Sequence, residues 1–313
     1  MPSSPTYRSG FIAIVGRPNV GKSTLLNRLV GQPVSITADK PQTTRNRVMG
    51  VRHGKTQGRP WQAVFLDTPG IHQAADLLNR RMVQYAAASL KDADLVVMVV
   101  EPFPPGRGEP GPQDTLVWEM VSRATPPAML VVNKSDAAPP ERIESTMAWF
   151  RHAAEGARRP WMGVTAVSAL TGMGVTALLD AVETRLPEGP PYFEEGQVSD
   201  QPENMFIAEM IRQEVFRRTH EEIPYSTAVV VDHKEEAGKM LTIHATLLVE
   251  RDSQKGILIG KRGKMLGDIG KAARLQLEAL LGTKIFLDLR VKVAKNWSAD
   301  GRRLTELGYP EES

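Results

Sequence analysis

The sequence predicts an α/β fold: a doubly wound, mostly parallel sheet with a glycine-rich loop, followed by a smaller α+β unit. Three observations support this. A glycine loop stands directly between an apolar run and a helical pattern, further apolar runs alternate with helical patterns, and the order of elements changes after a stretch rich in proline, glycine and acids. We therefore expect one domain over residues 1–188, a linker over 189–203 and a second domain over 204–313.

The first predicted strand is Phe11–Val15, a short apolar run. Residues 16–23 match the pattern G-x-x-x-x-G-K-[ST], and an amphipathic run closed by Gly31 follows. The N–H groups of such a loop and the positive helix end bind phosphates. Lys22 is expected to reach the β/γ oxygens, and the Ser23 hydroxyl to bind magnesium. The expected nucleotide-binding residues of the loop are Gly16, Arg17, Pro18, Asn19, Val20, Gly21, Lys22 and Ser23.

Further strands and helices are expected in alternation. The apolar runs cover residues 63–66, 95–100, 128–132 and 163–167, and helical patterns lie near 76–90, 113–123, 141–154 and 174–186. This alternation is typical of a parallel sheet with helices on both faces. Residues 101–112 are rich in proline and glycine and are predicted to form a surface loop.

A second box, Asp67-Thr68-Pro69-Gly70, ends the run at 63–66. An aspartate here holds magnesium through water, and the Gly70 N–H contacts the γ-phosphate. In the loop 36–45, a threonine is expected to bind magnesium and the γ-phosphate; we choose Thr44 over Thr43, although spacing does not separate them. Lys22, Thr44 and Gly70 are thus the expected catalytic residues.

The residue after this box is Ile71, which cannot hydrogen-bond an attacking water, so the intrinsic hydrolysis rate should be slow. Within the glycine loop, the amide oxygen of Asn19 is placed to help bind a monovalent cation beside the phosphates. The alternative is that Asn19 merely caps the loop, and the residues alone weigh both equally.

The box Asn133-Lys134-Ser135-Asp136 selects the base. Its Asp136 carboxylate accepts two hydrogen bonds from guanine N1–H and the 2-amino group, a donor pair that adenine lacks, so it favours GTP over ATP. At the next strand end, Ser168 is followed by Ala169, whose N–H is placed to reach guanine O6. These boxes follow strands whose carboxyl ends share one edge of the sheet, where ligands bind.

The second domain is predicted to run α-β-β-α-α-β. Helical residues 204–220 precede strands at 227–232 and 241–250, joined by a charged turn; a helix then ends at Gly282 and a last strand spans 285–293. Residues 255–303 hold twelve Lys/Arg against four Asp/Glu, in a chain of net charge +3. This excess suggests a polyanion-binding surface, although a solvated charged face explains it equally well. Trp297 is expected to pack, with RNA stacking as the alternative.

Together these boxes resemble the Era family, GTPases with a C-terminal type II KH domain. The resemblance implies GTP/GDP and Mg²⁺ as cofactors, with K⁺ used by relatives that carry the loop asparagine. It also implies binding to the 3′ end of small-subunit (16S) ribosomal RNA and assistance in 30S subunit maturation. The G-x-x-G loop would approach the RNA backbone, with Ile259 in the floor under unstacked bases. The RNA-binding residues implied are Ile259, Gly260, Lys261, Arg262, Gly263 and Lys264.

The composition of the chain excludes several kinds of functional site. The chain has no cysteine, which excludes disulfides, zinc–thiolate sites and thiol nucleophiles. No signal peptide is evident at Met1–Pro5, and the apolar runs are too short to span a bilayer, so we expect a cytoplasmic protein. We also expect it to be a monomer. Two rival functions remain: a constitutive RNA-binding scaffold with a structural nucleotide site, and a GTPase with weak peripheral association at the inner face of the membrane.

Overall fold

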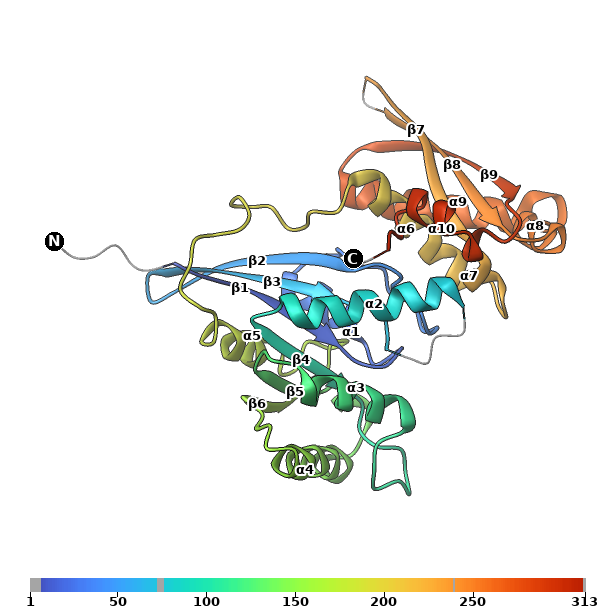
Figure 1. Ribbon diagram of the computed structural model, residues 1–313. Helices are drawn as coiled ribbons and strands as arrows, with labels where there is room; N and C mark the ends of the chain where they lie inside the picture. Colours follow the sequence, from blue (N-terminus) through green and yellow to red (C-terminus); the bar gives the residue numbers. More distant parts are fainter. Residues whose placement is uncertain (1–6, 72–75, 239, 312–313) are drawn as a thin grey trace.

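The structure, a computed structural model, describes residues 7–71, 76–238 and 240–311. Met1–Pro5 lies outside these residues. Two sheets organise the described chain (Figure 1). The first has six strands in the order β2-β3-β1-β4-β5-β6, and the second has three in the order β7-β8-β9. The predicted fold class is confirmed.

In the first sheet, β1 pairs in parallel with β3 and β4, and the parallel order continues through β5 to β6. The central strands β4 and β5 are buried along their whole length, as expected for parallel strands covered on both faces. The strands are β1 (Arg8–Val15), β2 (Val48–Thr56), β3 (Arg59–Asp67), β4 (Leu95–Val100), β5 (Ala128–Val132) and β6 (Gly163–Ala166).

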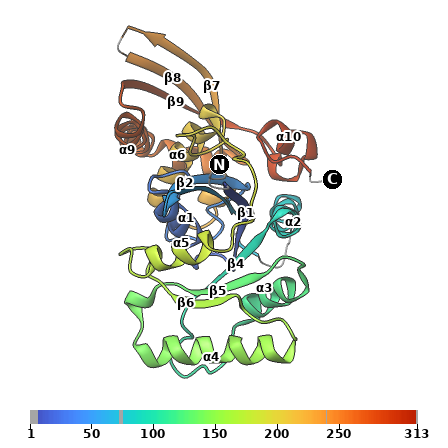
Figure 2. The ribbon, with the colours of Figure 1, turned by 90° about the vertical axis from the view of Figure 1, so that its left-hand side faces the viewer.

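Helices cover both faces of this sheet (Figure 2). One apolar core lies under α1 and α5 and includes Ile12 of β1, Leu25 and Leu178; the other lies under α2, α3 and α4 and includes Ala13, Leu90 and Phe150. The helices are α1 (Lys22–Val30), α2 (Leu77–Asp92), α3 (Pro112–Arg123), the 3-10 turn η1 (Ser135–Ala137), α4 (Pro140–Gly156) and α5 (Val175–Glu183).

The sequence analysis missed the edge strand β2, which pairs antiparallel with β3. Its residues include Gly50, His53 and Gly54, so no apolar run marks it. A two-residue turn joins the two strands, with positive φ at Gln57 and Gly58. Such a turn matches the twist of a hairpin and was the local signal available.

The second unit follows the predicted α-β-β-α-α-β order, with short helices added. In its sheet β7 is antiparallel to β8, and β8 is parallel to β9. The residues predicted to form a charged turn belong largely to β7, which continues to Ala237. The elements are α6 (Glu203–Arg218), α7 (Ile223–Ser226), β7 (Ala228–Ala237), β8 (Met240–Val249), α8 (Asp252–Ile259), η2 (Lys261–Gly263), α9 (Lys264–Leu281), β9 (Lys284–Val293), η3 (Trp297–Ala299) and α10 (Gly301–Glu306).

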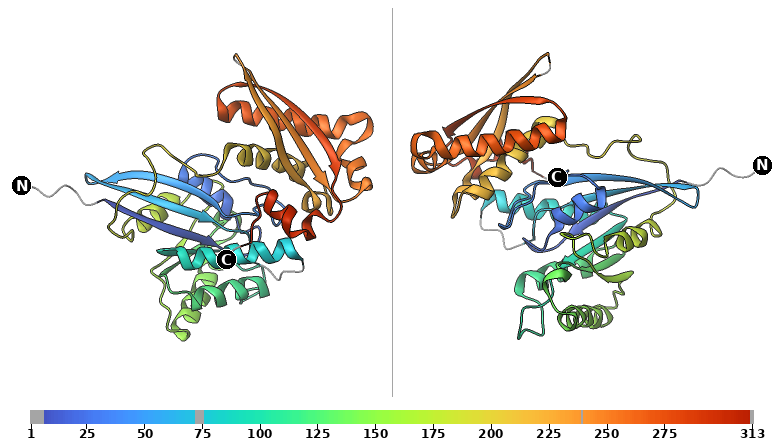
Figure 3. Two further views of the ribbon diagram at one scale, coloured as in Figure 1. Left: turned by 45° about the horizontal axis from the view of Figure 1, so that its top comes forward. Right: turned by 180° about the vertical axis from the view of Figure 1, so that it is seen from behind.

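Two segments connect the sheets. The stretch predicted as a linker lies along the edge of the first sheet: Val198 O accepts from Val51 N at 2.8 Å, and Phe193 O accepts from Gln62 Nε2 at 2.9 Å. The segment around α10 lies beside α2 (Figures 2 and 3), where Arg81 donates to Tyr309 O. The linker is thus paired with the first sheet, and the α10 segment places the second unit against α2.

Trp297 is fully buried and donates from Nε1 to Ser226 O at 2.9 Å, which confirms that it packs. Its neighbours in this small core include Leu78 and Met82 of α2. Among the described residues, no helix has the length and apolar character needed to cross a bilayer.

Candidate nucleotide site and nucleic-acid groove

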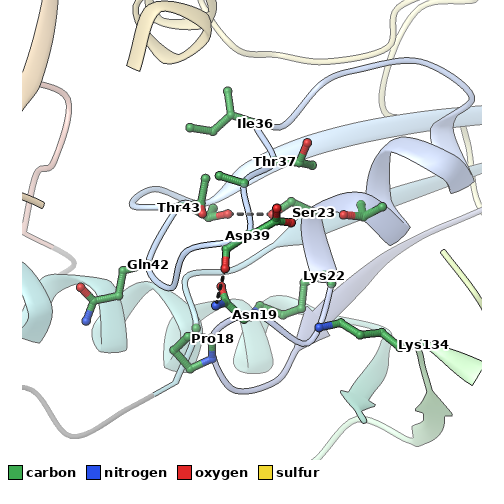
Figure 4. A pocket seen from close by; sticks show the side chains of 15 residues that line it. Pro18, Asn19, Lys22, Ser23, Ile36, Thr37, Asp39, Gln42, Thr43 and Lys134 are labelled. Atoms are coloured by element: carbon green, nitrogen blue, oxygen red, sulfur yellow. Dashed lines mark hydrogen bonds between the residues drawn. The ribbon is translucent and has the colours of Figure 1, made fainter. Parts of the chain in front are cut away.

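The glycine loop between β1 and α1 borders a cavity of about 220 Å³ (Figure 4). Pro18, Asn19, Gly21, Lys22 and Ser23 line one side of it. The opposite side comes from residues 36–39 and 42–44, with Gly70 and Lys134 completing the wall. The structure therefore brings the glycine loop, residues 36–45 (the threonine loop) and parts of the Asp67 and Asn133 boxes to one place.

Two glycines permit close approach in this site. Gly21 has φ 92°, and a Cβ there would lie 2.3 Å from Asn133 Nδ2. A Cβ on Gly70 would lie 2.6 Å from Pro18 N. Contacts this short do not occur for real side chains, so both boxes pack on the glycine loop only because glycine is present.

Lys22 is buried and donates from Nζ to Gly16 O and Arg17 O, each at 3.0 Å. Burial lowers the pKa of Lys22 to about 8, against the opposing attraction of Asp67. Three other glycine-loop residues expected at the site, Gly16, Arg17 and Val20, do not line the cavity. Arg17 points to Glu101 and Asp114, and Val20 is fully buried.

Three oxygen-bearing side chains meet beside the loop. Ser23 Oγ lies 2.6 Å from Asp67 Oδ2 and 2.8 Å from Thr44 Oγ1, and Thr44 Oγ1 lies 3.4 Å from Asp67 Oδ2. Ser35 Oγ also donates to Asp67 Oδ2, at 3.0 Å. Thr43 Oγ1 instead donates to Lys40 O, so this geometry favours Thr44 over Thr43.

These residues fit a magnesium ion. Hydroxyl, carboxylate and phosphate oxygens are its preferred ligands. The second carboxylate oxygen of Asp67, Oδ1, is buried and has no hydrogen-bond partner in the described part of the chain. Burial raises the pKa of Asp67, while Lys22 and the three hydroxyl donors lower it. A divalent cation would stabilise the ionised carboxylate that this chemistry requires.

Ile71 lies away from the cavity. Its side chain is fully buried in the core under α2 to α4, and its N–H donates to Gly16 O at 3.2 Å. Thr68 is likewise buried, with Oγ1 donating to Ile14 O at 2.8 Å. Pro69 is buried too. In this conformation the box contributes Asp67 and Gly70 to the site, whereas Ile71 anchors it to the sheet.

The residues predicted to select the base are assembled around Asn133. Its Nδ2 donates to Val20 O at 2.7 Å, and its Oδ1 accepts from Ala169 N at 2.9 Å. The Ala169 N–H, expected to reach guanine O6, thus contacts Asn133 in this structure. Lys134 pairs with Glu101, and the Asp136 side chain is exposed. Ser168 is fully buried, with Oγ accepting from Thr171 N at 3.1 Å, so it shapes the loop.

Asn19 connects the glycine loop to the threonine loop. It adopts φ 64°, and its Nδ2 donates to Asp39 O at 3.1 Å (Figure 4). That bond does not use Oδ1, the atom expected to contact a cation. The geometry is compatible with both roles, so the potassium site stays a prediction.

The sequence analysis missed the attachment of the threonine loop to the second unit. Thr37 N donates to Gln213 Oε1 at 2.8 Å, and Lys40 Nζ donates to two carbonyls at the end of α6. Arg45 donates to Thr227 O at 2.8 Å, while Ile36 packs in the core of the second unit. These contacts join residues far apart in sequence, so no local pattern predicts them.

A groove of about 280 Å³ lies between α9 and β9, beside the G-x-x-G loop. Leu266, Leu287 and Leu289 supply its apolar lining, and Lys271 and Arg274 supply positive charge. Lys261, Arg262 and Lys264 are exposed at the loop. The period-2 spacing of the two β9 leucines and the helical spacing of the two α9 cations were the signals that could have identified this lining.

The predicted floor residue Ile259 does not line this groove. It ends α8 and is partly buried against the core of the second unit. Gly260 and Gly263, both with positive φ, form the turn from α8 into α9, and Gly263 also lines the groove. The apolar floor is therefore built from α9 and β9.

Two family models match the chain: a "50S ribosome-binding GTPase" model over residues 11–134 and a "KH domain" model over residues 222–298. A protein named GTPase Era from Geobacter metallireducens is 48% identical over 309 residues, covering 98% of this chain and 99% of its own length. A GTPase Era from Lactobacillus helveticus is 44% identical over 305 residues, covering 97% and 96%.

Two solved structures are similar over almost the whole chain. One is Aquifex aeolicus Era Y63A bound to GDP·AlF₄⁻, and the other is Era in complex with MgGDPNP and nucleotides 1506–1542 of 16S ribosomal RNA. Each has a TM-score of 0.88 and 34% sequence identity, and each match covers 97% of this chain and 99% of the other.

Proposed function

This chain belongs to the Era family of GTPases, and we propose that it is a GTP-driven switch that binds the 3′ end of 16S ribosomal RNA and assists 30S subunit maturation. It is a GTPase that uses GTP, GDP and Mg²⁺. The proposal assigns nucleotide handling to residues 1–188 and RNA binding to residues 204–313, joined by 189–203. It also places the protein in the cytoplasm, as a monomer that acts on the small subunit.

The proposed nucleotide roles follow the geometry of the cavity. Lys22 neutralises the β/γ oxygens, and Ser23, Thr44 and Asp67 hold magnesium, which neutralises the charge that develops on the phosphates. Asp136 selects guanine. Gly70 and the threonine loop contact the γ-phosphate, so hydrolysis releases both. With Ile71 in the core, the attacking water is placed without that side chain.

One observation carries the RNA half of the proposal. A relative matched along 97% of this chain was solved with a segment of 16S ribosomal RNA, and this chain has an apolar groove with a basic rim beside its G-x-x-G loop. KH grooves hold splayed single-stranded bases while the loop approaches the backbone. Loss of GTP contacts at the threonine loop would alter how this groove is presented, because that loop is attached to α6.

The test is binding of the full chain to a labelled oligonucleotide with the 16S 3′-end sequence, with a GTP analogue or with GDP. Lys271→Ala combined with Arg274→Ala should weaken binding at least tenfold and reduce its salt dependence. The control is Lys292→Ala combined with Lys295→Ala, which removes the same charge from exposed positions outside the groove. Equal losses in the two double variants would reduce the interaction to general electrostatics and refute the groove.

A further inference from the structure

Arg212 of α6 is a buried cation that the chemistry above does not use. Its side chain is 1% exposed, although an unpaired guanidinium would strongly resist burial. Glu209 pairs with it, through Nε at 2.7 Å and through Nη2, and the guanidinium lies 5.1 Å from the Phe216 ring centroid. Burial lowers the pKa of Arg212, but Glu209 outweighs this and the net shift is upward. The side chain is therefore charged and held in one place.

The remaining contact of Arg212 reaches the other unit of the chain. Its Nη2 donates to Thr43 O at 2.5 Å. Charge-assisted hydrogen bonds of this kind are about twice as strong as neutral ones. An arginine of the second unit thus donates a hydrogen bond to the backbone of the threonine loop, one residue before Thr44.

The Thr43–Thr44 peptide plane connects this hydrogen bond to the nucleotide cavity. All described peptide bonds are trans, so the Thr43 carbonyl and the Thr44 N–H point in opposite directions. Because the carbonyl faces α6, the Thr44 N–H faces away from α6. Thr44 itself lines the cavity, and its hydroxyl contacts Ser23 and lies near Asp67.

We propose that Arg212 is a positioning residue for the GTPase reaction: by holding the Thr43 carbonyl, it sets the Thr44 N–H and hydroxyl for the γ-phosphate and magnesium. The nucleotide site is then completed by the second unit. This inference rests on the proposed role of Thr44. It also predicts that Arg212 favours GTP over GDP. GDP lacks the γ-phosphate that Thr44 is proposed to contact, so the Arg212–Thr43 hydrogen bond should add little to its affinity.

The experiment uses the full chain and measures affinity for fluorescent GDP and for a non-hydrolysable GTP analogue with Mg²⁺, together with the single-turnover hydrolysis rate. Arg212→Met keeps the length of the side chain and removes its hydrogen bonds. Affinity for the analogue and the hydrolysis rate should each fall about 10- to 100-fold, the loss expected for one charged hydrogen bond. Affinity for GDP should stay within about threefold.

The matched control is Arg217→Met on the same helix. Arg217 is 44% exposed and pairs with Glu214, and among its contacts in the described residues none reaches the threonine loop. It should leave both affinities unchanged. If Arg212→Met lowers GDP and analogue affinity equally, or lowers neither, the inference is overturned. If Arg212→Met does not fold, Arg212→Lys must show the same effect in smaller measure: a lower affinity for the analogue relative to GDP. An analogue-to-GDP affinity ratio equal to that of the wild type in Arg212→Lys overturns the inference.

Thr44→Ala separates this inference from the proposal beneath it. A selective loss in Thr44→Ala without one in Arg212→Met overturns the positioning role alone. An unchanged affinity ratio in Thr44→Ala overturns both the role of Thr44 and the inference. A wild-type chain that does not hydrolyse GTP would instead contradict the function assigned to the site.

Discussion

Nucleotide binding should take up a proton at alkaline pH, because Lys22 is buried before the phosphates arrive. With its pKa lowered to about 8, about a tenth of Lys22 is neutral at pH 7, about half at pH 8 and about nine tenths at pH 9. Bound phosphates favour the charged ammonium, so binding must restore the missing proton. Between pH 7 and pH 9, where the phosphates of the nucleotide stay ionised, the affinity should fall about tenfold.

Calorimetric titration of GDP in two buffers of different ionisation enthalpy measures this uptake directly. About 0.5 proton per nucleotide is expected at pH 8, where the phosphates of free GDP are already ionised. Lys22→Arg provides the control, since a guanidinium stays charged throughout this range and its uptake should vanish even where affinity is reduced. Uptake near zero at pH 8 in the wild type would mean that Lys22 is charged before binding, and the argument from burial would fail.

Three further outcomes test other parts of the site. Asp136→Asn should weaken GTP binding about 100-fold or more and favour XTP, because an amide donates to xanthine O2; unchanged GTP affinity would contradict the base assignment. The GTPase rate should be higher in potassium than in sodium at equal ionic strength if Asn19 binds a cation, and equal rates would leave it as a loop cap. Gly267→Ala places a methyl in open space at the groove, so it should stabilise α9 by about 1 kcal/mol, seen as a higher melting temperature, yet weaken RNA binding. Gly156→Ala in α4, also facing open space, should not affect RNA binding.

The parts of the site that the sequence predicted are those encoded by neighbours in the chain. The glycine loop, the Asp67 box and the Asn133 box each follow a strand of a parallel sheet, and that topology brings strand ends to one edge. The choice of Thr44 over Thr43 had no local basis. It required the position of Ser23 and Asp67 relative to the loop, which only the folded chain provides.

Other misses have the same cause. Strand β2 lies at the edge of the sheet and lacks an apolar run. It pairs with β3, and an edge strand can be stabilised by such pairing rather than by burial. The resemblance places Ile259 in the groove floor, and its contact with RNA stays a prediction; the lining leucines Leu287 and Leu289 come from β9, far along the chain from the G-x-x-G loop. Arg212 carries no sequence signal at all, because an arginine in a helix is usually solvated and its burial depends on a loop from the other unit.

The docking of the α10 segment on α2 also bears on how the chain is made. Tyr309 O contacts Arg81 across 228 positions of sequence, and Trp297 covers Leu78 and Met82. Domains fold from the N-terminal side during synthesis. The six-stranded sheet can thus form on the translating ribosome while one face of α2, the helix that follows the Asp67 box, is still exposed because the segment that packs on it has not been synthesised. A nascent chain stalled before residue 297 would hold a nearly complete nucleotide cavity next to an unfinished helix surface.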